Sequence, residues 1–111
     1  MVPIDKNKYE QISHEAENGQ ILFALINDQL GWLMYLREPG DAGFSSRNPN
    51  YEGSPNAKLD YYLSNGQRDE YPLAWAFPVA QVRQAIEYFR KEQQPPPFIV
   101  WHNDSGDGTK L

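Results

Sequence analysis

Cysteine is absent from this chain, and basic side chains are outnumbered by acidic ones. The lack of cysteine excludes a disulfide framework, a thiolate nucleophile and a zinc–thiolate site. There are 10 lysines and arginines against 15 aspartates and glutamates, which gives a formal charge of -5. This balance argues against direct binding to nucleic acid, because lysine and arginine on phosphates supply most of that affinity. It is compatible with a basic protein partner.

Long hydrophobic runs are also missing. The longest apolar stretch, Ile21 to Ile26, is far shorter than the roughly 20 residues that cross a bilayer. The first residues, MVPIDKNKYEQ, lack the apolar segment of a signal peptide. We therefore expect a cytoplasmic protein with no membrane partner. The length of 111 residues predicts a single domain, residues 1–111, with a mobile tail from about residue 102.

The first half of the chain predicts one helix and a strand hairpin. Tyr9, Ile12 and Ala16 recur at helical spacing, with Asp5 as an N-cap and Asn-Gly at 18–19 as the stop. The short apolar segment QILFALIN, bounded by turn residues, indicates a central strand. GWLMYLRE follows three residues later, and the two segments are expected to pair as an antiparallel hairpin.

A long loop and a second hairpin are predicted next. Residues 37–57 contain three each of Gly, Pro, Ser and Asn and show neither helical nor strand periodicity, which indicates a loop. Leu59, Tyr61 and Leu63 alternate with polar residues, and Asn65-Gly66 is a strong hairpin-turn signal. LAWAF, at 73–77, is expected to continue the returning strand after Pro72 interrupts its hydrogen bonds.

The segment after Pro78 gives the clearest helix. Its apolar stripe is made by Val79, Val82, Ile86 and Phe89. Three prolines at 95–97 end the helix and favour extended geometry, so they deliver FIVW as a short terminal strand. The predicted fold is α+β, a single domain in which one largely antiparallel β-sheet packs with two helices.

No motif for catalysis, metal binding or a cofactor stands out. The triad Ser13, His14 and Asp60 is the kind of combination that any small protein contains, and no nucleophile elbow is present. The tail matches the start of an EF-hand loop in residue type at 103, 105, 107 and 108. However, it ends before the carboxylate at position 12. The proline run also suits SH3- or WW-type grooves, but its neighbours 98–101 require burial, which favours a spacer. We expect no enzyme activity, no cofactor and no metal site.

Acidic and aromatic residues in the loops are the candidates for partner binding. Aromatic anchors among polar residues are typical of protein interfaces, and carboxylates can contact the Lys and Arg of a basic partner. Phe44 and Tyr51 either fill pockets on a partner or anchor the long loop to the domain. The tryptophans at 32, 75 and 101 are expected in the core. The predicted partner-binding residues are Glu38, Asp41, Phe44, Tyr51, Glu52, Asp69 and Glu70.

The segment from Leu59 to Trp101 resembles the Imm1-type immunity proteins of bacterial polymorphic toxin systems. The resemblance lies in a P-V-x-x-V start of a helix, an aromatic near the helix end, prolines, and a short strand closing on Trp. Here these are Pro78, Val79, Val82, Phe89, Pro95 to Pro97 and Trp101. The resemblance implies an α+β antitoxin, encoded beside a toxin, that inhibits by binding. It also implies a nucleic-acid deaminase as the toxin. The matched residues are structural, so they carry no binding role with them.

Three functions follow from these observations. The leading hypothesis is an antitoxin that covers the active site of a cognate toxin with a basic substrate cleft. The second is a non-catalytic regulatory or scaffold module that recognises another protein through its sheet edge. The third is a small enzyme built around His14 or His102.

Overall fold

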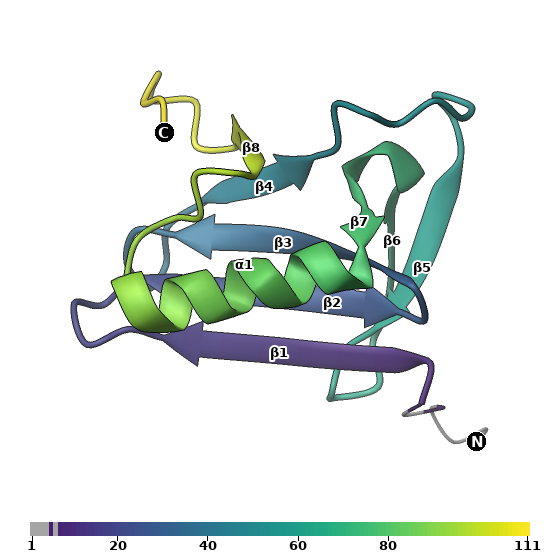
Figure 1. The fold of residues 1–111 in the computed structure, drawn as a ribbon, viewed down its shortest axis with the longest axis horizontal. Helices are drawn as coiled ribbons and strands as arrows, with labels where there is room; N and C mark the ends of the chain where they lie inside the picture. The colour runs from purple at the N-terminus through teal and green to yellow at the C-terminus, as the bar shows by residue number, and fades with distance from the viewer. Residues whose placement is uncertain (1–4, 6) are drawn as a thin grey trace.

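The main sheet of the protein is six-stranded and antiparallel throughout, in a computed structural model that describes residue 5 and residues 7–111. Its strands lie in the order β1 (Tyr9–Glu15), β2 (Ile21–Asn27), β3 (Leu30–Leu36), β4 (Phe44–Arg47) and β8 (Val100–Asn103), and the two-residue β7 (Phe77–Pro78) also pairs with β3 (Figure 1). The prediction of a largely antiparallel sheet is confirmed.

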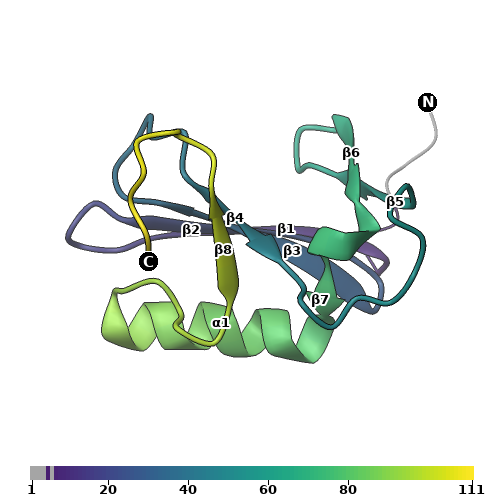
Figure 2. The ribbon, with the colours of Figure 1, turned by 90° about the horizontal axis from the view of Figure 1, so that it is seen from above.

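A hairpin and a helix cover opposite faces of this sheet. The hairpin strands β5 (Lys58–Tyr62) and β6 (Arg68–Pro72) form a separate two-stranded sheet on one face. The helix α1 (Val79–Glu92) lies across the other face, as the edge-on view in Figure 2 shows. Seen from its edge, the molecule therefore has three layers: hairpin, sheet and helix.

The helix predicted at the N-terminus is wrong, because residues 9–15 form the edge strand β1. All seven residues of β1 pair with β2, from Tyr9 opposite Asn27 to Glu15 opposite Ile21. Side chains alternate along it, so that Ile12 packs into the helix-side core while its neighbours point to the other face. Asn-Gly at 18–19 is the turn of this hairpin, with Gly19 at φ 89°, and not a helix stop. The protein thus has one α-helix in its described residues, not two.

The prediction of one continuous loop over residues 37–57 is also wrong, because it contains the four-residue strand β4. Three of these four residues, Phe44, Ser45 and Ser46, are buried. The Ser46 hydroxyl accepts a hydrogen bond from the Leu33 backbone N–H at 3.0 Å and donates one to the Trp75 carbonyl at 3.0 Å. A serine side chain thereby satisfies backbone groups that a regular ladder would otherwise pair. Small polar residues concealed this strand from pattern analysis.

The segment 73–77 does not continue the returning strand as predicted. β6 ends at Pro72, and a 3-10 turn, η1 (Leu73–Trp75), leads into β7. β7 leaves the hairpin and pairs with β3, with Phe77 opposite Gly31. Proline lacks a backbone N–H, so the ladder stops there and the chain crosses from one layer to the other.

Two hydrophobic cores lie on the two faces of the sheet. The helix-side core gathers residues from β2, β3, β4, α1 and the segment before β8, among them Leu33, Val82 and Phe89, each 0% exposed. The hairpin-side core is smaller and centres on Leu25, Trp32 and Tyr61. Of the tryptophans expected in the core, Trp32 is buried, while Trp75 and Trp101 are half-buried.

The segment after α1 holds β8 against β4. The helix ends at Glu92, and the next residue, Gln93, caps it in a left-handed conformation with φ 53°. Pro96 is fully buried, and its carbonyl accepts a hydrogen bond from the Trp101 indole N–H at 3.1 Å. The proline run therefore positions the edge strand, as the spacer prediction stated.

Candidate functional site

The predicted partner-binding residues are distributed over three separate parts of the fold. Glu38 and Asp41 lie in the β3–β4 connection, Tyr51 and Glu52 in the β4–β5 connection, and Asp69 and Glu70 on β6. The β3–β4 connection and β6 lie at opposite ends of the molecule in Figure 1. The fold therefore does not bring these residues into one compact cluster.

Asp41 is held in an ion pair inside its own loop. The Arg37 guanidinium donates to both carboxylate oxygens, from Nε and Nη2 at 2.9 Å each, and the Arg37 backbone N–H donates at 3.0 Å. These hydrogen bonds hold the pKa of Asp41 well below its usual range, and that of Arg37 above its own. The carboxylate side chain is only 8% exposed. Asp41 thus stabilises the loop and offers little surface to a partner.

Phe44 is a core residue, which corrects its prediction as a side chain that fills a partner's pocket and supports the alternative that it anchors the segment to the domain. It is 1% exposed and contacts Tyr35, at a ring-centroid distance of 6.0 Å. The guanidinium of Arg37 lies over its ring at 5.0 Å. Because β4 is a strand and not a loop, its first side chain points into the helix-side core.

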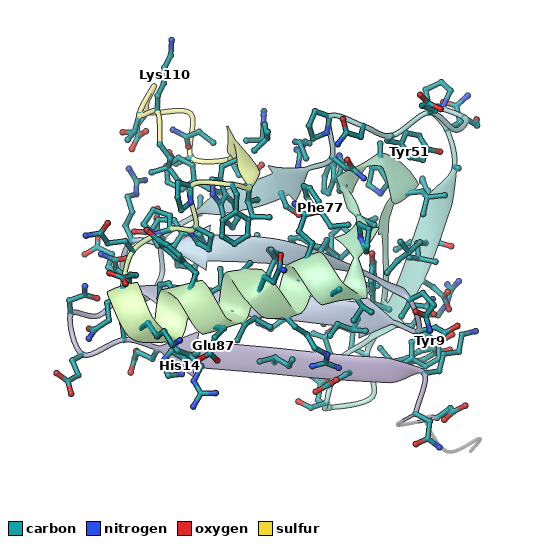
Figure 3. All side chains as sticks on the ribbon, viewed as in Figure 1. Tyr9, His14, Tyr51, Phe77, Glu87 and Lys110 are labelled. Carbon is teal, nitrogen blue, oxygen red and sulfur yellow. The ribbon has the colours of Figure 1, made fainter. Side chains whose placement is uncertain are left out.

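Tyr51 anchors its own loop, and the neighbouring Glu52 is exposed. The Tyr51 hydroxyl donates to the Ser54 carbonyl at 2.6 Å, and the ring is half-buried. Figure 3 shows Tyr51 at the far end of the molecule from Lys110. The anchoring alternative is therefore the one that its contacts support.

The two acidic residues on β6 are both engaged at the surface of the hairpin. Asp69 accepts hydrogen bonds from the Gln67 amide at 2.8 Å and the Tyr71 hydroxyl at 3.2 Å. Glu70 pairs with Arg68 at 3.1 Å in an exposed position. The Glu70–Arg68 pair is exposed and a partner can displace it, since ion pairs of this kind contribute little to stability, whereas Asp69 is half-buried.

The histidines do not form a catalytic arrangement. His14 points toward α1, where its ring meets Phe89 edge-to-face at 5.8 Å, while Ser13 points to the opposite face of β1. Asp60 accepts a hydrogen bond from Tyr9 at the other end of β1. His102 is exposed and lies 3.6 Å from Asp104. Among the described residues, no group of three or more His, Asp or Glu side chains has a geometry that suits a metal ion.

The structure draws attention instead to the edge of the sheet at β8. The large hydrophobic residues that are exposed within the described part of the chain are Phe98, Val100 and Leu111, at 44%, 49% and 55%. A cavity of about 570 Å³ lies between β8 and the tail that follows it, and Trp101, Asn103 and Leu111 are among its lining residues. A second cavity of about 190 Å³ lies between the prolines and Trp101. We call this region, residues 98–101 together with Leu111 and both cavities, the β8 surface.

The sequence contained a signal for the β8 surface that the prediction missed. FIVW was expected to be buried as a unit, but only Ile99 is fully buried, at 4% exposed. Val100 and Trp101 are the first two residues of β8, and successive side chains of a strand face opposite ways. Trp101 packs against the helix-side core, so Val100 faces away from it and is exposed. Phe98 precedes the strand in a turn and meets Tyr88 of α1 edge-to-face.

The tail after β8 is tied to the β3–β4 connection. The Arg37 Nη1 donates to Asp107 at 2.8 Å and to the Thr109 hydroxyl at 3.3 Å. The Asn103 amide donates to Asp107 at 2.8 Å and to the Thr109 carbonyl at 2.9 Å. The pKa of Asp107 lies well below its usual range because of hydrogen bonds from the Thr109 backbone and from the Asn103 and Arg37 side chains. These contacts fix one wall of the larger cavity.

Comparison with protein families identifies this architecture. The model of the family described as "Immunity protein Imm1" matches residues 2–103, almost the whole chain. The chain belongs to the Imm1 family of immunity proteins. This Imm1 protein is thus an antitoxin by family, as its C-terminal half indicated. Comparison with curated proteins and with solved structures found no match. Within the described residues, no helix of this Imm1 protein is long and apolar enough to span a membrane.

Proposed function

We propose that this Imm1 protein neutralises a toxin that acts on nucleic acid, a deaminase in the first instance, by covering the toxin's active site. Family membership supports an immunity protein that binds a cognate toxin. The charge of the chain supports the proposal that the toxin acts on nucleic acid and that its active site is covered. A cleft that binds nucleic acid is basic, because it neutralises phosphates, and carboxylates on an inhibitor can occupy the same positions.

The observation that carries this proposal is the acidic excess, -5 in 111 residues, with several of its carboxylates exposed outside any ion pair with Lys or Arg. Glu38 and Glu52 are exposed and, among the described residues, have no such partner within 4.0 Å. Glu70 is exposed and shares one arginine. Of the residues predicted for partner binding, Asp69 and these three glutamates keep that proposed role. Asp41 and Phe44 are internal, and Tyr51 supports the loop that carries Glu52.

The test uses the polypeptide encoded by the reading frame adjacent to this gene. Co-expression should restore growth to cells that the neighbouring polypeptide alone kills, and the two chains should co-purify as a complex. Purified complex should be inactive in a deamination assay on single- and double-stranded DNA and on RNA, with the free toxin active on at least one of them. Growth inhibition that persists on co-expression would refute the immunity function. If the chain protects cells but the active site of the bound toxin stays open to substrate, the immunity function stands and only the occlusion mechanism is refuted.

A further inference from the structure

The two edges of the main sheet differ in chemistry. The β1 edge carries polar and charged side chains such as Ser13 and Glu15, both exposed. Charged edge residues discourage pairing with another strand. The β8 edge is the opposite case, since the exposed large hydrophobic residues of the described chain all belong to the β8 surface. Val100 lies on the edge strand itself, Phe98 just before it, and Leu111 in the tail that walls the cavity, and exposed apolar side chains beside an unpaired edge favour an interaction site.

Backbone groups at the β8 edge are directed outward. The Asp104 N–H donates to the Gly43 carbonyl at 2.9 Å, which continues the β4–β8 register that pairs Ser45 with His102. In an antiparallel pair, hydrogen-bonded and non-hydrogen-bonded positions alternate. Residues 100, 102 and 104 therefore bond to β4, and Trp101 and Asn103 direct their N–H and C=O groups away from the sheet. Within the described residues, no turn, loop or cap hydrogen bond uses the backbone groups of these two residues.

A pocket adjoins these outward groups. The cavity of about 570 Å³ falls in the size range of ligand sites, and the half-buried Trp101 supplies aromatic surface to its lining, whereas Phe44, also in the lining, is only 1% exposed. Lys110 also lines it and projects outward from the tail in Figure 3. A strand edge next to an apolar pocket is the geometry of strand addition. In that mode main-chain bonds provide affinity and a pocket takes one side chain of the added strand.

We infer that an extended segment of the toxin adds to the main sheet alongside β8 and places a large apolar side chain in the cavity between β8 and the tail. This inference rests on the proposed function, because the occupant is the toxin. It assigns the docking surface to residues outside the loops that the sequence analysis selected.

Charge around the cavity favours a basic segment of a partner over a second copy of this chain. The tail that walls the cavity carries two carboxylates, on Asp104 and Asp107, against one base, Lys110. The whole chain carries a formal charge of -5. Two copies would bring these like charges together, whereas lysine or arginine beside the apolar residue of a toxin strand would be attracted to them. A segment with one large apolar residue flanked by Lys or Arg is therefore the expected occupant.

A charged residue at the β8 surface tests this inference with a matched control at the other edge. Val100→Lys removes an exposed apolar side chain and adds the charge that the basic segment would repel. Ser13→Lys makes the same addition on exposed β1. Binding is measured by titration calorimetry against the polypeptide of the adjacent reading frame. We expect Val100→Lys to weaken binding at least about tenfold and Ser13→Lys to change it less than about twofold. If Val100→Lys does not fold, Phe98→Lys repeats the test at another exposed position.

Hydrogen exchange of the wild-type complex tests the strand addition itself. The Trp101 and Asn103 amides point outward in the free chain and should become protected in the complex, while the outward Ser13 amide of β1 should not. A wild-type chain that fails to bind overturns the proposed function and this inference with it. Wild-type binding with unchanged affinity in Val100→Lys, or with no protection at 101 and 103, overturns this inference alone. A stable dimer of the free chain in light scattering that Val100→Lys dissociates would also overturn it, because a second copy would then occupy the edge.

Discussion

Two phenylalanines that border the β8 region should respond in opposite ways to the same substitution. Phe44 is 1% exposed in the helix-side core, and Phe98 is 44% exposed before β8. Phe44→Ala removes a ring that packs with Tyr35 and leaves space that the sheet cannot close. Truncations of this kind cost about 3–5 kcal/mol. Phe98 loses a single edge-to-face contact with Tyr88, at 5.9 Å, and its truncation should cost about 1 kcal/mol or less.

Thermal unfolding followed by circular dichroism separates the two outcomes. For a chain of this length, 1 kcal/mol corresponds to a shift in Tm of about 4 °C. Phe44→Ala should therefore lower Tm by roughly 12–20 °C, and Phe98→Ala by about 4 °C or less. In binding to the adjacent toxin, the order should reverse, with folded Phe98→Ala the weaker binder. Equal stability losses in the two variants would refute the assignment of Phe44 to the core and of Phe98 to the surface.

Three further predictions concern the tail, a turn and the charged surface. The depressed pKa values of Asp41 and Asp107 mean that their stabilisation is present above the ordinary carboxyl pKa of 3.8 and is lost as the pH falls below it. Arg37→Gln should thus have a lower Tm than wild type, by more at pH 7 than at pH 3. A Tm difference that is larger at pH 3 would contradict the claim that the ionised carboxylates stabilise the fold. Gly43→Ala should destabilise by about 1–3 kcal/mol, because φ is 81° and a Cβ would lie 2.8 Å from the Tyr35 carbonyl oxygen. Gly106→Ala, with φ 78° and open space, is its control and should cost less in the same thermal melts. Replacing the exposed acids Glu38, Glu52 and Glu70 with glutamine should slow association with the toxin and make its rate less dependent on salt in stopped-flow experiments. Glu87→Gln on α1 is the control.

Local sequence patterns were sufficient to predict the elements whose buried faces can be identified from their own residues. The stripe at Val79, Val82, Ile86 and Phe89 predicted α1 because one face of that helix packs on one core. The apolar run of β2 predicted a central strand because both of its faces are covered. The Asn65-Gly66 turn predicted the second hairpin for a local reason of backbone conformation.

The errors arose where long-range contacts decide the structure. Ile12 and Ala16 fit helical spacing equally well, and only pairing with β2 makes residues 9–15 a strand. β4 is built on Ser45 and Ser46, whose burial depends on β3 and on the Trp75 carbonyl. No local pattern contains that information.

The candidate site was less predictable than the fold for the same reason. Composition indicated acidic and aromatic candidates, but their mutual placement depends on how the connections cross the sheet. Asp69 and Asp41 are equivalent in sequence terms, yet one lies on the surface of the hairpin and the other is enclosed by Arg37. The run of apolar residues at 98–101 was a signal for exposed apolar side chains at this edge, but the cavity beside them depends on the course of the tail, which no local pattern contains.

Coverage of both broad faces of the main sheet, by α1 and by the β5–β6 hairpin, has a consequence for how such a protein changes over time. The two hydrophobic cores lie on these two faces, and the segment at the outer edge contributes to them only Ile99, which precedes β8, and the half-buried Trp101. Substitutions at the exposed Phe98 and Val100 can therefore accumulate without loss of the scaffold. With the toxin docked along β8, as we infer, the antitoxin can adapt to a diverging toxin through changes at these positions.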